Sequence, residues 1–377
     1  MASLYSGASS LVPLIDVVKD VSGGNPKVPA GSYVSTGQLQ VIDQGQEAVG
    51  GYTDDLANSF RSADLPVVVF GDHTKAVKYA DEPFAMGADG VKVLKPSERC
   101  DARYLYHFLK QSRLPDVGYS RHFKFVKRLS LPLPPLPEQR RIAAILDKAD
   151  ALREKRREAI AKLDQLLQSV FLDMFGDPVT NPKGWESVPL TEVGKFKSGS
   201  TPNKSKLEFW DGNFPWVSPK DMKTDYLTKS IDHVTEVAFE QTMLKKIAAG
   251  HLLIVIRGMI LARDFPTAIN DVEVAINQDM KAIEPDDRFN IFYLKAALDA
   301  ARRQVLSVVS TAGHGTKRFD RKDLETILVP RPPIGTQEKF AYIVQEIRAM
   351  RQRDLRAQQR ADALFLSVQQ SAFAGQL

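Results

Sequence analysis

The sequence predicts an α+β fold in which two similar globular units alternate with two long helices that pair as a coiled coil. Three observations support this prediction. Residues 131–176 and 332–375 share a proline-containing start, a long run of helix-forming residues and a terminal glycine, with Gln139 and Gln337 198 positions apart. The segments before them also match each other. Within both copies, short apolar runs that end at glycine are typical of buried strands.

The first long helix is expected to begin at Pro137 and to end before Gly176. Proline suits the first helical position, Glu138 complements the positive end of the helix dipole, and glycine commonly follows the last turn. The run between them is about 38 residues, roughly 57 Å of helix at about 1.5 Å per residue.

Apolar residues in both helices recur in a heptad pattern, which forms a narrow seam on each helix. A narrow seam needs a partner helix, and the other copy supplies one. The predicted core positions are Ile142, Ala149, Leu163 and Val170 with Ile145, Leu152, Ala159 and Leu166 in the first helix, and Phe340, Ile347, Ala361 and Val368 with Ile343, Met350, Ala357 and Leu364 in the second.

The globular parts repeat with an offset that grows along the chain. Residues 11–24 (LVPLIDVVKDVSGG) match residues 187–200 (SVPLTEVGKFKSGS) at an offset of 176, and Phe123 matches Phe319 at an offset of 196. Insertions in loops between matching core elements produce such a rise. The sequence therefore predicts a first domain at 1–130, a helical region at 131–178, a second domain at 179–329 and a helical region at 330–377.

Within each domain the strands precede the longest helix. Buried strands are expected at residues 67–70, 90–94 and 252–256 because these runs are short, apolar and flanked by glycine. Helices are expected at 101–111 and 287–302, each starting on an aspartate that can cap it.

Composition excludes several classes of protein. With 377 residues, 43% of them hydrophobic and 26% charged, the chain is neither disordered nor fibrous. A net charge of +5 and a pI near 9.0 lean towards a polyanionic partner. The one cysteine, Cys100, cannot form an internal disulfide. Because no run is apolar enough to span a bilayer and Met1 opens no signal-peptide pattern, the sequence predicts a cytoplasmic protein.

No catalytic or cofactor-binding constellation is found in the sequence. It has no Walker A pattern, dinucleotide fingerprint, HExxH motif or methyltransferase motif, so we expect no cofactor, no metal and no catalytic residue. Asp72, His73 and Lys75 follow a predicted strand and could belong to a metal nuclease site. The matching place in the second unit, IRGMIL, lacks an acid.

Polar loops carry the residue types that contact phosphates and base edges in DNA. Basic residues precede the same phenylalanine in both units, which favours contact with DNA over a merely solvated surface. Trp210 and Trp216 are expected to lie in the core or anchor loops rather than stack on bases. The predicted DNA-binding residues are His73, Lys75, Lys78, Arg121, Lys124 and Lys127 in the first unit, and Ser200, Thr201, Asn203, Lys204, Lys206, His314, Lys317, Arg318 and Arg321 in the second.

The segment LPPLPEQRRIAAILDKAD (133–150), the long helix and FGDP (175–178) resemble the specificity subunit of type I restriction-modification systems. The resemblance covers the whole chain. It implies two target-recognition domains that each bind one half of a bipartite double-stranded DNA sequence, and two helices packed as an antiparallel coiled coil. It also implies no catalytic site of its own, two methyltransferase (modification) subunits and restriction/translocase subunits as partners, and no membrane. One departure is Gly335 and Thr336, where the first helix has Pro137 and Glu138.

Two further hypotheses stay open from the residues. The basic run at 153–162 is either a solvated helix face or a groove for a partner subunit. The chain as a whole could instead be a stand-alone DNA nuclease, or a DNA-binding scaffold without a modification partner.

An antiparallel arrangement makes the residue numbers of facing core positions add to a constant, and 513 fits the apolar pattern. That register places Arg156 and Asp354 in adjacent layers, each opposite an alanine. We expect the two side chains to form a partly buried ion pair that fixes the register more than it adds stability.

Overall fold

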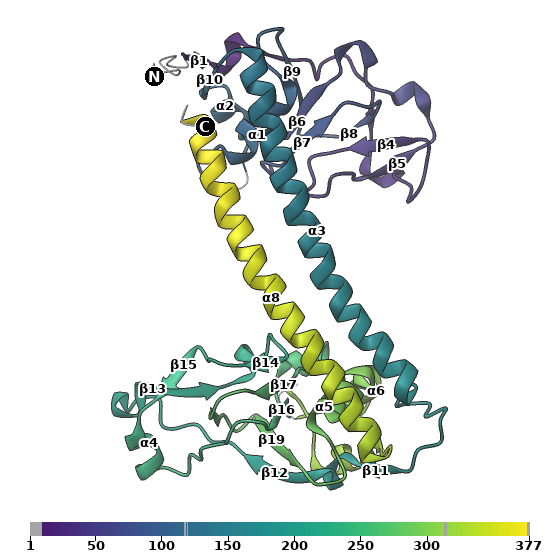
Figure 1. Ribbon diagram of the computed structural model, residues 1–377, viewed down its shortest axis with the longest axis vertical. Coiled ribbons are helices and arrows are strands. Elements are labelled where there is room, and N and C mark those ends of the chain that lie inside the picture. Colours follow the sequence, from purple (N-terminus) through teal and green to yellow (C-terminus); the bar gives the residue numbers. More distant parts are fainter. Residues whose placement is uncertain (1–9, 117, 119, 313–314, 375–377) are drawn as a thin grey trace, which may run out of the picture. The chain divides into compact units, whose positions relative to one another are not determined.

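A computed structural model describes residues 10–116, 118, 120–312 and 315–374, with the side chain of Ser62 excepted. The chain separates into two compact units, Met1–Glu158 with Arg356–Leu377, and Ala159–Leu355. Each unit holds one globular α+β part and one half of each of the long helices α3 (Leu136–Phe175) and α8 (Ile334–Phe373) (Figure 1). The predicted fold class is confirmed.

The two long helices run antiparallel, as contacts inside each unit show. In the first unit Ile142 and Leu146, near the start of α3, share a core with Phe365 and Ala372, near the end of α8. In the second unit the end of α3 contacts the start of α8: the ring centroid of Phe340 lies 5.6 Å from that of Phe171 and 5.4 Å from that of Phe175.

Half of the predicted helical seam is wrong by one residue. Leu152, Leu166, Met350 and Leu364 are 60%, 49%, 41% and 65% exposed. Buried positions lie one residue after the predicted Ile145, Ile343 and Leu364, at Leu146, Val344 and Phe365. The cause is an ambiguity of spacing: both i+3 and i+4 return to the same helix face, and the sequence offers apolar side chains at both. Charged or polar residues such as Arg153 and Gln358 occupy the true seam, so the apolar pattern of the sequence does not mark it.

The register also differs slightly from the prediction. The numbers of Arg153 and Asp362, and of Asp164 and Arg351, add to 515, two more than predicted. Arg156 belongs to the first unit and Asp354 to the second, so their ion pair stays a prediction.

In the first unit a four-stranded sheet of order β2-β9-β6-β7 packs against α1, a second sheet has the order β3-β8-β4-β5, and β1 pairs with β10. The predicted strands correspond to β6 and β9. The elements are β1 (Leu11–Pro13), β2 (Val18–Asp20), β3 (Lys27–Val28), β4 (Leu39–Ile42), β5 (Gly51–Thr53), β6 (Val67–Gly71), β7 (Val77–Ala80), β8 (Ala85–Gly87), β9 (Val91–Pro96), α1 (Ala102–Gln111), α2 (Phe123–Val126) and β10 (Ser130–Pro132).

The second unit repeats this plan, which confirms the predicted duplication. Its main sheet, β12-β19-β16-β17-β14, matches the first and adds one strand; a smaller sheet is β15-β13-β18, and β11 pairs with β22. The elements are β11 (Ser187–Pro189), β12 (Gly194–Ser198), β13 (Trp210–Val217), β14 (Tyr226–Leu227), β15 (Asp232–Val234), α4 (Glu236–Gln241), β16 (Leu252–Val255), β17 (Thr267–Asn270), β18 (Ala275–Ile276), β19 (Met280–Pro285), α5 (Ile291–Ala300), α6 (Arg302–Ser307), β20 (Ser310–Thr311), β21 (Lys317–Arg318), α7 (Arg321–Thr326) and β22 (Leu328–Pro330).

The capping predictions divide. Asp101 caps α1, because its carboxylate accepts hydrogen bonds from the N–H groups of Arg103 and Tyr104. Asp287 does not cap α5: the helix begins later, and the Asn290 side chain accepts from the Phe292 N–H instead. Asparagine serves the same role as aspartate at this position.

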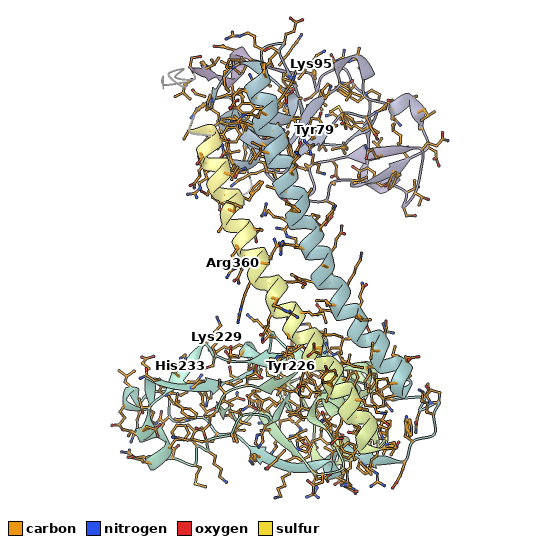
Figure 2. The ribbon with its side chains drawn as sticks, in the orientation of Figure 1. Tyr79, Lys95, Tyr226, Lys229, His233 and Arg360 are labelled. Carbon is orange, nitrogen blue, oxygen red and sulfur yellow. The ribbon has the colours of Figure 1, made fainter. Side chains whose placement is uncertain are left out.

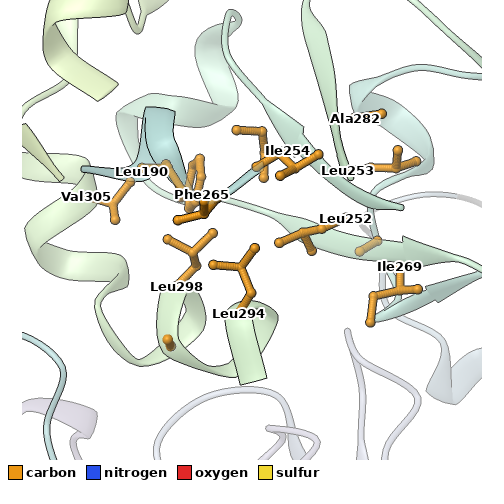
Figure 3. Close-up of a cluster of buried hydrophobic side chains, with 14 of the residues drawn as sticks. Leu190, Leu252, Leu253, Ile254, Phe265, Ile269, Ala282, Leu294, Leu298 and Val305 are labelled. Carbon is orange, nitrogen blue, oxygen red and sulfur yellow. The ribbon is translucent and has the colours of Figure 1, made fainter. Parts of the chain in front are cut away.

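The core of the second unit forms where the main sheet meets α5 (Figure 3). Leu252, Leu253 and Ile254 of β16 are fully buried in the same cluster as Leu294 and Leu298 of α5. Burying one such side chain stabilises the fold by about 1.5–3 kcal/mol. The cluster therefore stabilises the main sheet, whose strands the loops connect.

A buried glutamine joins each long helix to the domain before it. In the first unit the Gln139 side chain accepts from the Asp101 N–H at 2.8 Å and donates to the carbonyls of Arg99 and Pro134. Gln337 makes the matching three bonds in the second unit, with the Asn290 N–H and the carbonyls of Arg288 and Pro332. Both glutamines are fully buried. The repeated EQ and QE motifs therefore fix where each helix leaves its domain.

Candidate nucleic-acid interface

In the first unit, two loops meet at the end of the central strand β6. The Asp72 carboxylate accepts from the Phe123 N–H at 2.7 Å, and the Asp72 carbonyl accepts from the His122 N–H at 2.8 Å. Asp72 is only 5% exposed. Its carboxylate thus joins two loops. Among the described residues, no group of acids, histidines and cysteines could hold a metal.

The predicted basic residues of the first unit occupy different environments. Lys75 has a left-handed backbone (φ 61°) and pairs with Asp116 at 3.2 Å. Arg121, Lys124 and Lys127 are exposed on and around α2. The His73 N–H donates to the side-chain carbonyl of Gln44.

The structure contradicts the predicted position of Lys78. It was expected in or beside a loop, but it lies in strand β7, is 7% exposed, and its ammonium group pairs with Asp43 at 3.2 Å. A charge that is buried this deeply needs its partner, so Lys78 is part of the fold.

The second unit brings the corresponding loops together in the same way. The Phe319 N–H donates to the Ile256 carbonyl at 2.9 Å, and the Gly258 N–H donates to the Lys317 carbonyl at 2.9 Å. Arg257 and Arg318 form an isolated β-bridge. The segment before Phe319 is therefore fastened to the end of β16, as the segment before Phe123 is to the end of β6.

A third loop of the second unit, residues 199–206, is held by both tryptophans. The indole N–H of Trp216 donates to the Ser200 carbonyl at 3.1 Å, and that of Trp210 donates to the Asn203 carbonyl at 3.2 Å. Trp216 is 3% exposed. The prediction that these tryptophans anchor loops is confirmed.

Most of the remaining predicted DNA-binding residues of the second unit lie in or beside these loops. Three of them form exposed ion pairs within the chain, which are weak. Lys206 pairs with Glu208 at 3.5 Å, Arg318 with Asp320 at 2.9 Å and Arg321 with Glu325 at 3.0 Å. Exposed pairs of this kind contribute about 0–1 kcal/mol, so a phosphate could replace the carboxylate. Lys204 is exposed, the Lys317 ammonium donates to the Thr311 hydroxyl, and the Thr201 hydroxyl donates to the Gln278 side chain. His314 lies outside the described residues.

Sequence reasoning missed Arg257 and Gln278, two exposed residues among the same loops. Neither belongs to a polar or basic run, which is the pattern that predicts the other DNA-binding residues. Their positions beside the matched ends of β16 and β19 could have indicated them, because loops at the ends of paired central strands gather at one edge of a sheet.

Each domain also contacts the long helices through charged side chains, but with different residues. In the first unit Arg103 and His107 both lie 2.8 Å from Asp147 of α3. In the second, Arg348 of α8 pairs with Asp271 and stacks on Tyr226, 3.7 Å from the ring centroid. Tyr226 is labelled beside α8 in Figure 2.

The fold and the site together define a class: a protein with two similar α+β domains, each presenting basic loops, joined by an antiparallel helical pair. The family model for the type I restriction modification DNA specificity domain matches residues 62–162 and 182–360. This chain belongs to that family and is a DNA specificity subunit of a type I restriction-modification system.

Individual relatives agree. The chain is 29% identical to the EcoR124I/EcoR124II specificity subunit of Escherichia coli, over 88% of this chain and 85% of that protein. The type I S subunit structure from M. genitalium superposes with a TM-score of 0.62 at 16% identity, covering 99% of this chain and 98% of the other. A chain from a structural study of complex assembly in the type I system gives a TM-score of 0.55 at 19% identity, with 98% of both chains covered. Among the described residues, no helix is both long and apolar enough to cross a membrane.

Proposed function

We propose that the domains at 1–130 and 179–329 each bind one half of an asymmetric bipartite DNA target. The helical regions at 131–178 and 330–377 then set the spacing of the two halves and dock two methyltransferase subunits, with restriction/translocase subunits completing the complex. The chain itself supplies no catalytic group and acts in the cytoplasm.

One observation carries this proposal: the same pair of loops, fastened through Phe123 in one unit and Phe319 in the other, presents basic residues twice in one chain. Phosphate contacts of this kind position a protein on DNA, while residues between them contact base edges. Because the two loop sets differ in sequence, the two half-sites are expected to differ as well.

Exchanging domains tests the proposal. Replacing residues 1–130 by the recognition domain of another specificity subunit should change one half of the methylated sequence and leave the other half and the spacing unchanged. The readout is the map of methylated bases in cells that carry the exchanged subunit with its methyltransferase. A change in both halves at once would contradict independent recognition.

Incubation of the purified chain with DNA and magnesium tests the non-catalytic role. The expected result is intact DNA, because the Asp72 carboxylate is bonded to the main chain and is 5% exposed. Cleavage that is lost on Asp72→Asn would establish a nuclease instead.

A further inference from the structure

Gln278 lies in a turn that is hydrogen-bonded to two of these loop segments, one at Ser200 and one at the end of β16. It occupies the turn between β18 and β19, and its side chain is exposed. The turn itself is rigidly held: Asn277 is 7% exposed, its N–H donates to the Val217 carbonyl, and its side-chain oxygen accepts from the Asp279 N–H at 3.1 Å. The fold therefore displays a polar side chain from a fixed backbone.

The side-chain amide of Gln278 is oriented as well. Its oxygen accepts a hydrogen bond from the Thr201 hydroxyl. The segment that carries Thr201 is seated on the turn, since the Ser200 N–H donates to the Ile276 carbonyl at 3.0 Å. A Cβ at Gly199 would lie 2.1 Å from that carbonyl oxygen, so only glycine allows so close an approach. Holding the amide in one orientation reduces the entropy lost when it binds a ligand.

The turn also adjoins backbone segments that carry basic residues. The Asp279 carbonyl accepts from the N–H groups of both Ile256 and Arg257, which places Arg257 beside the turn. The next residue, Gly258, donates its N–H to the Lys317 carbonyl, so the backbone of Lys317 lies beside that of Gly258. A fixed amide with basic residues on the adjoining backbone suits a DNA groove, where phosphates border the base edges.

The chemistry of the amide selects one base. Adenine presents an acceptor, N7, and a donor, the N6 amino group, in the major groove, and a glutamine side chain pairs with both. The Gln278 oxygen has two lone pairs, so it can accept from Thr201 and from N6 together, while the amide NH₂ donates to N7. Guanine presents two acceptors at that edge, and cytosine presents only a donor, so neither matches this amide equally well.

We propose that Gln278, oriented by Thr201, is a specificity-determining residue that binds one adenine in the major groove of the half-site recognised by the second unit. This inference depends on the proposed function, because it requires residues 179–329 to bind DNA. Asp89 stands at the corresponding place in the first unit, 189 positions earlier, so the first half-site meets a different side chain.

Selection from a DNA pool tests the inference. The full chain, assembled with its methyltransferase subunits, is allowed to bind duplexes randomised across both half-sites, and the bound sequences are read. Gln278→Ala should lower the preference for adenine at one position of one half-site by about 5- to 150-fold, the range that corresponds to about 1–3 kcal/mol. Thr201→Val should weaken the same preference less, and Thr201→Ser should restore it. Gln241→Ala, at an exposed glutamine of the same unit, is the matched control.

Replacing the adenine at that position by 7-deazaadenine sharpens the test. Wild-type protein should lose affinity because N7 is gone, whereas Gln278→Ala should bind both duplexes equally. If Gln278→Ala leaves every position unchanged while Arg257→Ala and Lys317→Ala weaken binding, the adenine contact is wrong but DNA binding by this unit stands. If the charge variants also have no effect, the proposed function of the unit fails.

Discussion

The two units attach their domains to the long helices by one shared device and one that differs. Gln139 and Gln337 make the same three hydrogen bonds, and the hydroxyls of Tyr104 and Tyr293 donate to the carbonyls of Pro132 and Pro330. The charged contacts do not repeat. At the helix position where the second unit has Arg348, paired with Asp271, the first has Asp150, paired with Lys110 at 2.7 Å.

This difference shows which contacts the architecture requires. A buried glutamine that pairs main-chain groups cannot be exchanged cheaply, because each group left unpaired costs about 1–3 kcal/mol. The side chains of these ion pairs are 22–40% exposed. A pair that stays in contact with water contributes about 0–1 kcal/mol, and either order of charges supplies it. The amide contacts therefore define the common frame, and the ion pairs are free to differ.

The largest effect is expected at the shared device. Gln337→Ala removes the partner of three main-chain groups. At about 1–3 kcal/mol for each group left unpaired, it should lower the free energy of unfolding of the second unit by about 3 kcal/mol or more. All three tryptophans (Trp185, Trp210 and Trp216) lie in that unit, so denaturant unfolding followed by their fluorescence reports on it. Gln345→Ala, at an exposed position of α8, is the control. Equal transitions for the two variants would show that the buried amide does not hold the helix in place.

The next effect concerns the charged contact of the second unit. Arg348→Asp removes both the ion pair with Asp271 and the stacking on Tyr226, and should cost about 1–2 kcal/mol, measured by the same fluorescence transition. Adding Asp271→Arg should recover the ionic part and leave the stacking part lost. A double variant no more stable than Arg348→Asp would mean that the order of charges matters after all.

A smaller effect depends on pH and belongs to the first unit. Burial lowers the pKa of His107, against the opposing effect of its hydrogen bond to Asp147. The folded state then binds fewer protons than the unfolded state, so this contribution to stability is present above the unfolded pKa of about 6.5 and is lost as the pH falls below it. Ala296 stands at the corresponding place in the second unit and cannot titrate.

His107→Gln should flatten the dependence of stability on pH between about 7 and 5, as followed by circular dichroism during urea unfolding. His251→Gln is the control in the second unit, where burial also lowers the pKa of the histidine. This variant should alter the pH dependence of unfolding of the second unit, which tryptophan fluorescence reports. It should leave the pH dependence of unfolding of the first unit unchanged. An unaltered slope for His107→Gln would exclude His107 as a source of acid sensitivity.

The sequence predicted the parts of the fold that depend on repetition. Matching segments identified two units, two helices and the strands β6, β9 and β16, because buried elements keep their apolar pattern. The exact seam of the helices escaped prediction, since Ile145 and Leu146 are both apolar and only packing decides between them. Lys78 was predicted in or beside a loop, because an isolated lysine in a sequence carries no sign of the carboxylate that it meets in the fold. Gln278 was missed because its position depends on a turn and on Thr201, 77 residues away.

The loops that we propose to contact DNA are expected to agree in charge between the two units and to differ in their base contacts. Lys317→Ala and Arg318→Ala should each lower the slope of log affinity against log salt by about one unit, because each removes one phosphate contact and the counterion it displaces. Arg121→Ala, at the matching place before Phe123, should do the same for the first unit. Lys339→Ala, an exposed lysine on α8 outside the loops, should leave the slope unchanged. The preferred sequence should stay the same in all four variants, because phosphates carry no sequence information. A changed sequence preference would show that these residues contact bases, and an unchanged slope would remove them from the interface.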